Sequence, residues 1–143
     1  MTGTISTLEA SDNLLVLGET LRPLLTNAMG SPIEIFDTRG PANAGPPPHT
    51  HAWDEFYVAL EGDLEVRLGG GLPQTLPKGA AVHIPAGTVH SYRNLSDDTH
   101  FLTIVTKGNA DKFFHEIAAK VEMNPPDISE VVRVGKSYGI NFV

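Results

Sequence analysis

Short apolar runs separated by turn residues dominate the middle of the chain. The runs expected to form strands are residues 33–36, 49–60, 64–68, 81–85, 91–94 and 100–106. Strands at such regular spacing, with Gly, Pro, Asn and Asp between them, are typical of a β-barrel or jelly-roll sandwich. The stretch from Arg39 to Pro48 is rich in Gly and Pro, so it is predicted to be a loop that leads into the strand beginning at His49.

The two ends of the chain show other patterns. Residues 1–30 contain two short apolar runs, 14–17 and 21–25, which we expect to form an arm or short edge strands. After Gly108, apolar residues recur at helical spacing, and Asn109 or Asp111 can cap the helix that this spacing predicts. The prolines at 125 and 126 end the pattern, and a second short helix is expected from Asp127 to Gly135.

Together these patterns predict an all-β domain with short C-terminal helices. No stretch of flexible composition separates the strands from the helices, and no internal repeat is visible. We therefore expect a single domain over residues 1–143, with a barrel core at about 33–106. The helical segment at about 109–135 is expected to pack on the outside of the barrel.

Composition narrows the possible functions. The 143 residues carry a net charge of −7. A surface that binds nucleic acid or an anionic membrane needs clustered positive charge, so neither kind of partner is expected. Cysteine is absent, which excludes thiolate nucleophiles and cysteine-based metal sites. No apolar run has the length of a membrane span and no secretory signal is visible, so a cytoplasmic location is expected.

Three histidines and one glutamate stand in a pattern that suggests a metal site. Side chains alternate along an extended strand, so His49, His51 and Glu55 are predicted to point the same way. Two histidines at this spacing are by themselves more often ordinary surface or core residues. The glutamate strengthens the metal hypothesis, because an inward carboxylate is costly to bury unless it is paired or bound to a metal.

The wider spacing of these residues resembles the two motifs of the cupin superfamily. The first resemblance is His49-x-His51-x3-Glu55-x6-Gly62, and the second is Gly79-x5-Pro85-x-Gly87-x2-His90-x3-Asn94. Family members usually have a glycine six residues before the first histidine, where this chain has Asn43. The resemblance covers about residues 33–106 and implies a small cupin β-barrel, or jelly roll.

The resemblance also implies one divalent metal ion held by His49, His51, Glu55 and His90. Such a mixed nitrogen and oxygen set suits Zn, Fe, Ni, Cu or Mn, and Zn is the expected ion because it fits the cyclase chemistry described below. It leaves one or two positions for water or substrate, as catalytic metal sites do. There are two alternatives to catalysis. The metal could only stabilise the barrel, or the protein could keep the ligands and merely bind a small molecule.

Five more residues are candidates for the surroundings of the metal. Trp53 and Tyr57 have the same strand parity as the ligands and are predicted to line a substrate pocket, with ordinary core packing as the alternative. Tyr92 shares the parity of His90, and His83 and His100 lie on strands near the second motif. These three are the candidate catalytic groups, and a structural role is the alternative for each.

The ligand set permits two kinds of reaction on a small molecule. The size of the chain and the helices after the barrel resemble the cupin cyclases of aromatic polyketide pathways, of the resistomycin type. This implies a metal acting as Lewis acid in aldol cyclisation and dehydration of a poly-β-keto chain. A resemblance to quercetinase-like cupins implies a dioxygenase instead, and a non-catalytic small-ligand-binding cupin is the third reading. Small cupins commonly pair, so a homodimer is expected.

Overall fold

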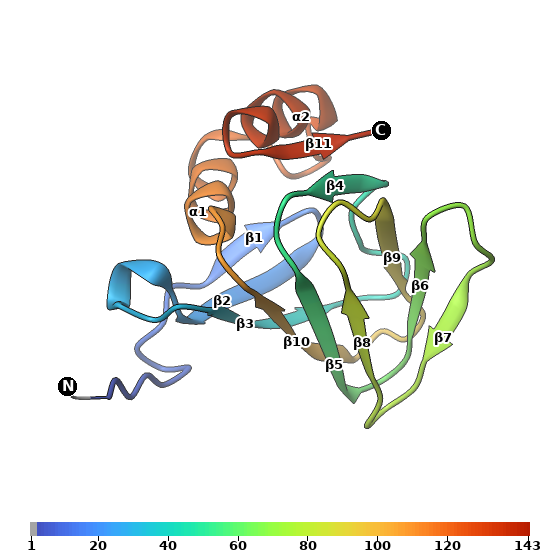
Figure 1. Ribbon diagram of the computed structural model, residues 1–143, viewed down its shortest axis with the longest axis horizontal. Helices are drawn as coiled ribbons and strands as arrows, with labels where there is room; N and C mark the ends of the chain where they lie inside the picture. Colours follow the sequence, from blue (N-terminus) through green and yellow to red (C-terminus); the bar gives the residue numbers. More distant parts are fainter. Residues whose placement is uncertain (1–2) are drawn as a thin grey trace.

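The computed structural model describes residues 3–143, which form two antiparallel β-sheets and two α-helices (Figure 1). The six-stranded sheet has the order β1 (Leu14–Val16), β2 (Glu19–Leu25), β3 (Glu34–Gly40), β10 (Thr99–Val105), β5 (Glu55–Glu61) and β8 (Ala81–Ile84). The five-stranded sheet has the order β11 (Ile140–Phe142), β4 (His49–His51), β9 (His90–Asn94), β6 (Leu64–Leu68) and β7 (Gln74–Leu76). This arrangement confirms the predicted all-β jelly roll.

Two strand predictions need correction. The run 49–60, predicted as one strand, is two strands in different sheets, because the chain bends at residues 52–53 and crosses from β4 to β5. Arg39 and Gly40, predicted to be loop residues, belong to β3, where they pair with His100 and Thr99 of β10. Pairing with a long neighbouring strand thus overrides the local turn signal.

The N-terminal apolar runs form edge strands, one of the two alternatives expected for them. β1 and β2 pair as a hairpin through Leu17 and Gly18, both of which have positive φ, at 51° and 84°. β2 also pairs with β3, so the hairpin extends the six-stranded sheet, and a 3-10 turn at Asn27–Met29 follows it.

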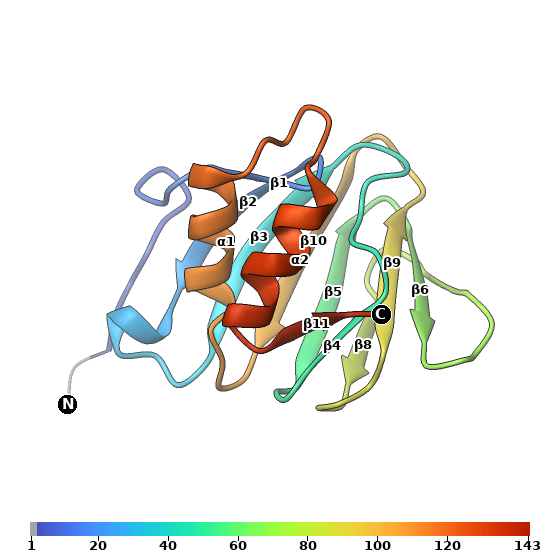
Figure 2. The ribbon, with the colours of Figure 1, turned by 90° about the horizontal axis from the view of Figure 1, so that it is seen from above.

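The helices lie outside the two sheets, as predicted, and cover one end of the sandwich beside β1 and β11 (Figure 2). α1 spans Ala110–Lys120 and ends before the proline pair, because Val121 is already extended. α2 spans Ile128–Ser137, and the side chain of Asp127 caps its first turn by accepting from the amide of Glu130 at 3.3 Å. Neither β11 nor β7 is predicted by the sequence pattern.

The buried apolar side chains form two clusters. One lies between the two sheets and contains Tyr57, Leu64 and Phe101. The other joins the helices to the open end of the sandwich, where Phe113 and Val131 pack with Phe36 and Trp53. Among the described residues, no helix has the length and apolar character needed to cross a membrane.

Candidate metal centre

Four side chains from three strands meet between the sheets. His49 and His51 come from β4, Glu55 from the start of β5 and His90 from the start of β9. One ligand atom of each lies within 4.8 Å of the others, and all four residues are buried. His49 and His90 are the only residue pair at which β4 and β9 meet in register, so the sheet itself holds these two rings together.

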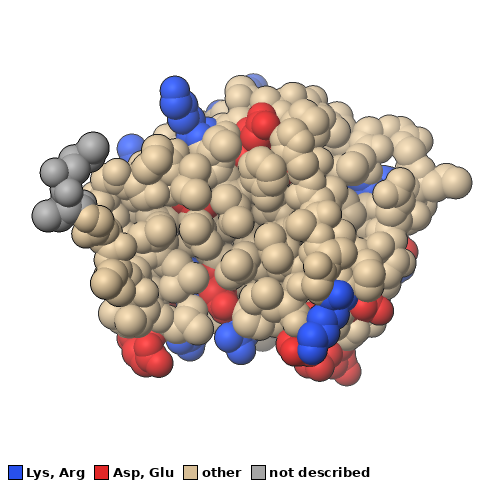
Figure 3. All heavy atoms as spheres, turned by 60° about the horizontal axis from the view of Figure 1, so that its bottom comes forward, with Lys and Arg blue, Asp and Glu red and all other residues tan. Residues whose placement is uncertain are grey.

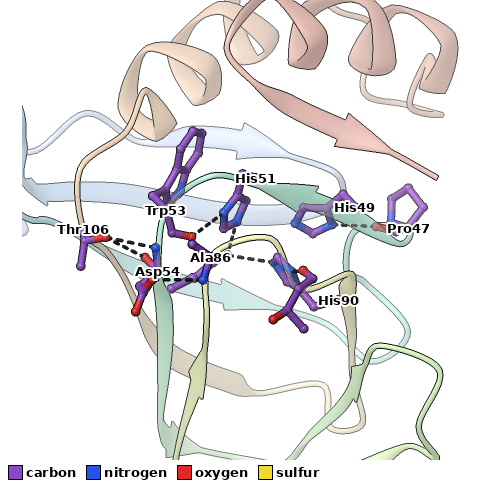
Figure 4. Close-up of polar contacts among 10 residues, drawn as sticks. Pro47, His49, His51, Trp53, Asp54, Ala86, His90 and Thr106 are labelled. Atoms are coloured by element: carbon purple, nitrogen blue, oxygen red, sulfur yellow. Dashed lines mark hydrogen bonds and ion pairs between the residues drawn. The ribbon is translucent and has the colours of Figure 1, made fainter.

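The three imidazoles share one hydrogen-bonding pattern (Figure 4). Each donates a hydrogen bond from Nδ1 to a backbone carbonyl: His49 to Pro47 at 2.9 Å, His51 to Trp53 at 2.9 Å and His90 to Thr88 at 2.8 Å. A carbonyl only accepts, so the proton of each neutral ring is on Nδ1 and the lone pair is on Nε2. Such outer hydrogen bonds are the usual way in which metal-binding histidines are fixed.

Two of these rings direct their Nε2 atoms toward the carboxylate of Glu55. Its Oε2 lies 2.8 Å from Nε2 of His51 and 3.0 Å from Nε2 of His90. If both rings were neutral, their lone pairs would face those of the carboxylate, an arrangement that requires either a proton on Nε2 or a cation between them. The donor set therefore fits a divalent metal ion.

The charges at the cluster follow from burial. Burial and the nearby His90 lower the pKa of His49 to about 4, so this ring is neutral at pH 7 with a free lone pair. Burial raises the pKa of Glu55, but hydrogen bonds from His51 and His90 outweigh it and bring the pKa to about 2. At neutral pH the cluster thus offers a carboxylate and at least one free imidazole nitrogen.

The loop before β4 carries His49 to its place. Asn43 has φ 72°, and it occupies the position at which the cupin motif usually has glycine. Asn tolerates this left-handed conformation better than most residues, which explains how the loop keeps its path without glycine. Its amide donates to the carbonyl of Asn94 at 2.8 Å, and the amide of Asn94 donates to the carbonyl of Ala44 at 2.9 Å. These bonds tie the loop to β9.

A cavity of about 60 Å³ adjoins the cluster. His49, His51 and Glu55 line it, and most of the remaining wall is apolar. That wall combines β1, β2, α1 and β11 through Val16, Leu21, Phe113, Phe114, Ile140 and Phe142. The C-terminal elements therefore contribute to the site as well as covering the sandwich.

The structure divides the other predicted site residues into two groups. Trp53, Tyr57 and Tyr92 line the cavity. His83 lies on the outer side of the six-stranded sheet, where it bonds Asp54 at 2.8 Å and its side chain is 50% exposed. His100 is on that side too and bonds Asp37 at 2.6 Å. Neither of these two histidines lines the cavity, because each pairs in register with an outward-facing neighbour.

One buried carboxyl in the cavity wall was not predicted. Glu19, on β2, is only 3% exposed and lines the same cavity as the histidine cluster. Glu19 and Leu21 both lie on the inward side of β2, with Thr20 between them on the other side. A glutamate on the apolar side of a strand is the sequence signal that could have identified it.

A comparison with known proteins identifies a family that the chain matches. Residues 38–105 match the family described as Cupin domain. The chain is 34% identical over 106 residues to quercetin 2,3-dioxygenase of Bacillus subtilis, an alignment that covers 72% of this chain and 31% of that protein. The chain thus spans about a third of the length of this relative.

Two solved structures share the fold. KdgF from Halomonas sp. superposes with a TM-score of 0.68 at 22% identity, over 78% of this chain and 99% of the other. The polyketide cyclase RemF from Streptomyces resistomycificus gives a TM-score of 0.60 at 21% identity, over 73% of this chain and 78% of the other. Both likenesses concern the arrangement of the strands.

Proposed function

Residues 38–105 of this chain form a cupin domain, and on that basis we propose that the protein is a metal-dependent enzyme acting on an enolisable carbonyl compound. Its chemistry would be that of a cyclase, with aldol closure and dehydration of a β-keto unit. The observation that carries the proposal is the buried cluster of His49, His51, Glu55 and His90 beside an apolar cavity.

The four ligands and the wall around them have distinct tasks. A divalent cation held by the cluster would supply Lewis-acid stabilisation of negative charge on a carbonyl oxygen. The backbone carbonyls of Pro47, Trp53 and Thr88 keep the imidazoles in the tautomer that offers Nε2. The apolar wall excludes water, which strengthens electrostatic interactions inside the cavity.

The size of the cavity limits the substrate. A volume of about 60 Å³ accommodates an ion with a few waters, or a ligand portion of a few heavy atoms. Cavities that enclose whole drug-sized ligands are several times larger, roughly 300 Å³ or more. We therefore propose that a single β-dicarbonyl unit reacts here, either as a small molecule or as the reacting end of a longer polyketide.

A dioxygenase is the second candidate, and the 34% identity to quercetin 2,3-dioxygenase favours it. The cluster suits the redox metals Fe, Ni and Cu as well as Zn. The two candidates differ in their need for oxygen, because only the dioxygenase consumes it.

The test is proton exchange without oxygen. Zinc-loaded protein is incubated under nitrogen in D2O with a β-keto ester, and replacement of the α-protons by deuterium is followed by NMR. We expect the zinc-loaded protein to exchange the α-protons faster than the same concentration of free zinc does. In His90→Ala the exchange rate should fall to that of free zinc. Oxygen uptake in proportion to product by iron-, nickel- or copper-loaded protein, with no anaerobic exchange, would overturn the cyclase in favour of the dioxygenase. Binding of the ester without exchange or oxygen uptake would leave a ligand-binding protein.

A further inference from the structure

Glu19 is a buried carboxyl group in the wall of the cavity. Its Oε1 accepts a hydrogen bond from the hydroxyl of Tyr92, and its Oε2 accepts one from Nδ2 of Asn94 at 3.0 Å. Within residues 3–143, no Lys, Arg or His forms an ion pair or hydrogen bond with it. Burying a carboxylate without a cation is costly, so a group kept at such a position is a candidate for a functional role.

The surroundings are shaped to hold this side chain. A Cβ at position 40 would lie 2.8 Å from Cγ of Glu19 and 2.7 Å from Nδ2 of Asn94, so the glycine there leaves the space that both side chains need. Asn94 directs its donor toward Glu19 while its own Oδ1 is buried without a hydrogen-bond partner. The side chain of Asn94 is thus oriented to donate a hydrogen bond to the carboxyl group of Glu19.

Glu19 faces the same cavity as the histidine cluster. Two phenols, Tyr57 and Tyr92, line the cavity with it. Tyr92 follows His90 by two residues on β9, and Tyr57 follows Glu55 by two residues on β5. Their rings meet edge to face with centroids 5.1 Å apart. Glu19 therefore lines one cavity together with His49, His51 and Glu55 of the cluster, and the hydroxyl of Tyr92 is bonded to it.

We propose that Glu19 is the general acid–base of the reaction, an inference that rests on the proposed function. The Glu19 carboxylate takes an α-proton from the carbonyl substrate. The C–H bond breaks, an O–H bond forms on Glu19, and the electron pair passes into the enolate, whose negative charge is on the carbonyl oxygen. In the dehydration step the protonated Glu19 returns the proton to the departing hydroxyl, which leaves as water.

The electrostatics of the cavity suit this role. Burial raises the pKa of Glu19 to about 7, although hydrogen bonds from Tyr92 and Asn94 act in the opposite direction. A group with a pKa near the working pH exchanges protons in both directions. Burial holds the pKa of Tyr57 and of Tyr92 well above the usual value, so both phenols stay protonated. The other titratable groups that line the cavity are Glu55 on β5 and His49 and His51 on β4, and the walls from β1 and α1 are apolar.

The test compares Glu19→Gln with Glu34→Gln. Glu34 is also a buried glutamate, but it lies on β3 and accepts from the amides of Asn27 and Asp111, away from the cavity. In the anaerobic exchange experiment with the β-keto ester, we expect kcat to fall about 100-fold or more in Glu19→Gln. KM and zinc content should stay unchanged in both variants, and kcat should stay unchanged in Glu34→Gln.

A second readout does not depend on turnover. The carbonyl stretch of a protonated carboxyl group, followed by infrared spectroscopy of the protein in the presence of a chelator, should titrate near pH 7. This band should be missing in Glu19→Gln and present in Glu34→Gln. Its absence from the wild-type protein would overturn the proposal.

The two possible failures are distinguishable. Exchange at the wild-type rate in Glu19→Gln would remove Glu19 as the acid–base and leave the metal-dependent function standing. No exchange in the wild-type zinc protein would refute the proposed function, and the role of Glu19 in it would be refuted with it.

Discussion

Trp53 holds His51 in two ways at once. The carbonyl oxygen of Trp53 accepts a hydrogen bond from Nδ1 of His51 at 2.9 Å, and its indole ring stacks on the same imidazole, with centroids 4.5 Å apart and planes 6° apart. The hydrogen bond fixes the tautomer and the stacking fixes the plane of the ring. Gly108 makes this possible, since a Cβ there would lie 2.6 Å from Cδ2 of the indole.

Replacing Trp53 should therefore weaken metal binding without removing a ligand. We expect Trp53→Phe to lower zinc affinity about 10-fold, because the smaller ring leaves His51 less firmly oriented. Competition with a chromophoric chelator measures this. Phe114→Leu is the control, because Phe114 lines the same cavity but its ring meets Phe36 edge to face and Phe113 at a tilt, and it meets none of the three ligand rings. An equal loss in both variants would show that general packing, and not the contact with His51, is responsible.

Metal content should separate the histidines of the cluster from those outside it. His90→Ala removes one of four ligands and should reduce bound zinc after dialysis well below one ion per chain, whereas His83→Ala should retain the wild-type content. Elemental analysis of the dialysed proteins gives the result. Wild-type zinc content in His90→Ala and in His51→Ala would mean that the ligands are misidentified.

The pH dependence of stability should reveal Glu19. Its pKa is about 7 in the folded protein and near the ordinary value of 4.5 in the unfolded chain. Because the folded pKa is the higher one, the stabilising contribution is complete below pH 4.5 and is lost as the pH rises through 7. The free energy of unfolding of the wild type relative to Glu19→Gln should fall by about 3 kcal/mol between pH 4.5 and 8.

Urea denaturation at both pH values measures this difference. A chelator must be present, because metal binding is itself pH-dependent. The comparison with Glu19→Gln isolates Glu19 from His49, whose lowered pKa changes the stability in the opposite direction over a similar range. A difference that does not change with pH would place the pKa of Glu19 at its ordinary value.

Asn43 offers a test of the loop that carries His49. Its φ of 72° suits Asn or Gly but not a β-branched residue. Asn43→Val should lower the free energy of unfolding by about 1–2 kcal/mol, whereas Asn43→Gly should leave it within about 0.5 kcal/mol. Urea unfolding curves decide between these outcomes. Equal destabilisation by both substitutions would indicate that the side chain of Asn43, and not its backbone conformation, matters.

The predicted homodimer can be tested on the outer face of the six-stranded sheet. Phe56, Val58, Leu102 and Ile104 alternate with inward residues and are half-buried there. Figure 3 views the molecule from this side, and charged side chains are sparse over its middle. Light scattering should give twice the 15.3 kDa mass of the chain, and Leu102→Lys should give the monomer. Leu72→Lys, in an exposed loop, is the control. A wild-type mass of 15.3 kDa would refute the dimer.

Local sequence signals identified most of the elements. Alternating apolar residues located β5, β6, β8, β9 and β10, and helical periodicity located α1 and α2. Short strands carry weaker signals, so β7 and β11 were not predicted, although Ile140 of β11 pairs with His51 and lines the cavity. Their conformation comes from the partner strand and not from their own composition.

The position of the bend after β4 also depends on the whole fold. Strand parity placed His51 and Glu55 on one side by treating residues 49–60 as one strand. In the structure the two residues are in different sheets, and they meet because the chain crosses at residues 52–53 into the facing sheet. Parity led to the right grouping, but the distance between the two side chains depends on the packing of one sheet on the other.

The sequence by itself determined the jelly roll through strand periodicity, and its resemblance to the cupin motifs implied the four residues of the cluster, because periodicity and motif spacing are local properties of the chain. Only the tertiary structure decided which side chains share the cavity. His83 and His100 were as plausible as Tyr92 from their strands, yet both face outward, and Glu19 lies far from His90 in sequence but lines the cavity beside Tyr92. Register between strands and the packing of the helices determine these positions, and neither can be read from a single segment.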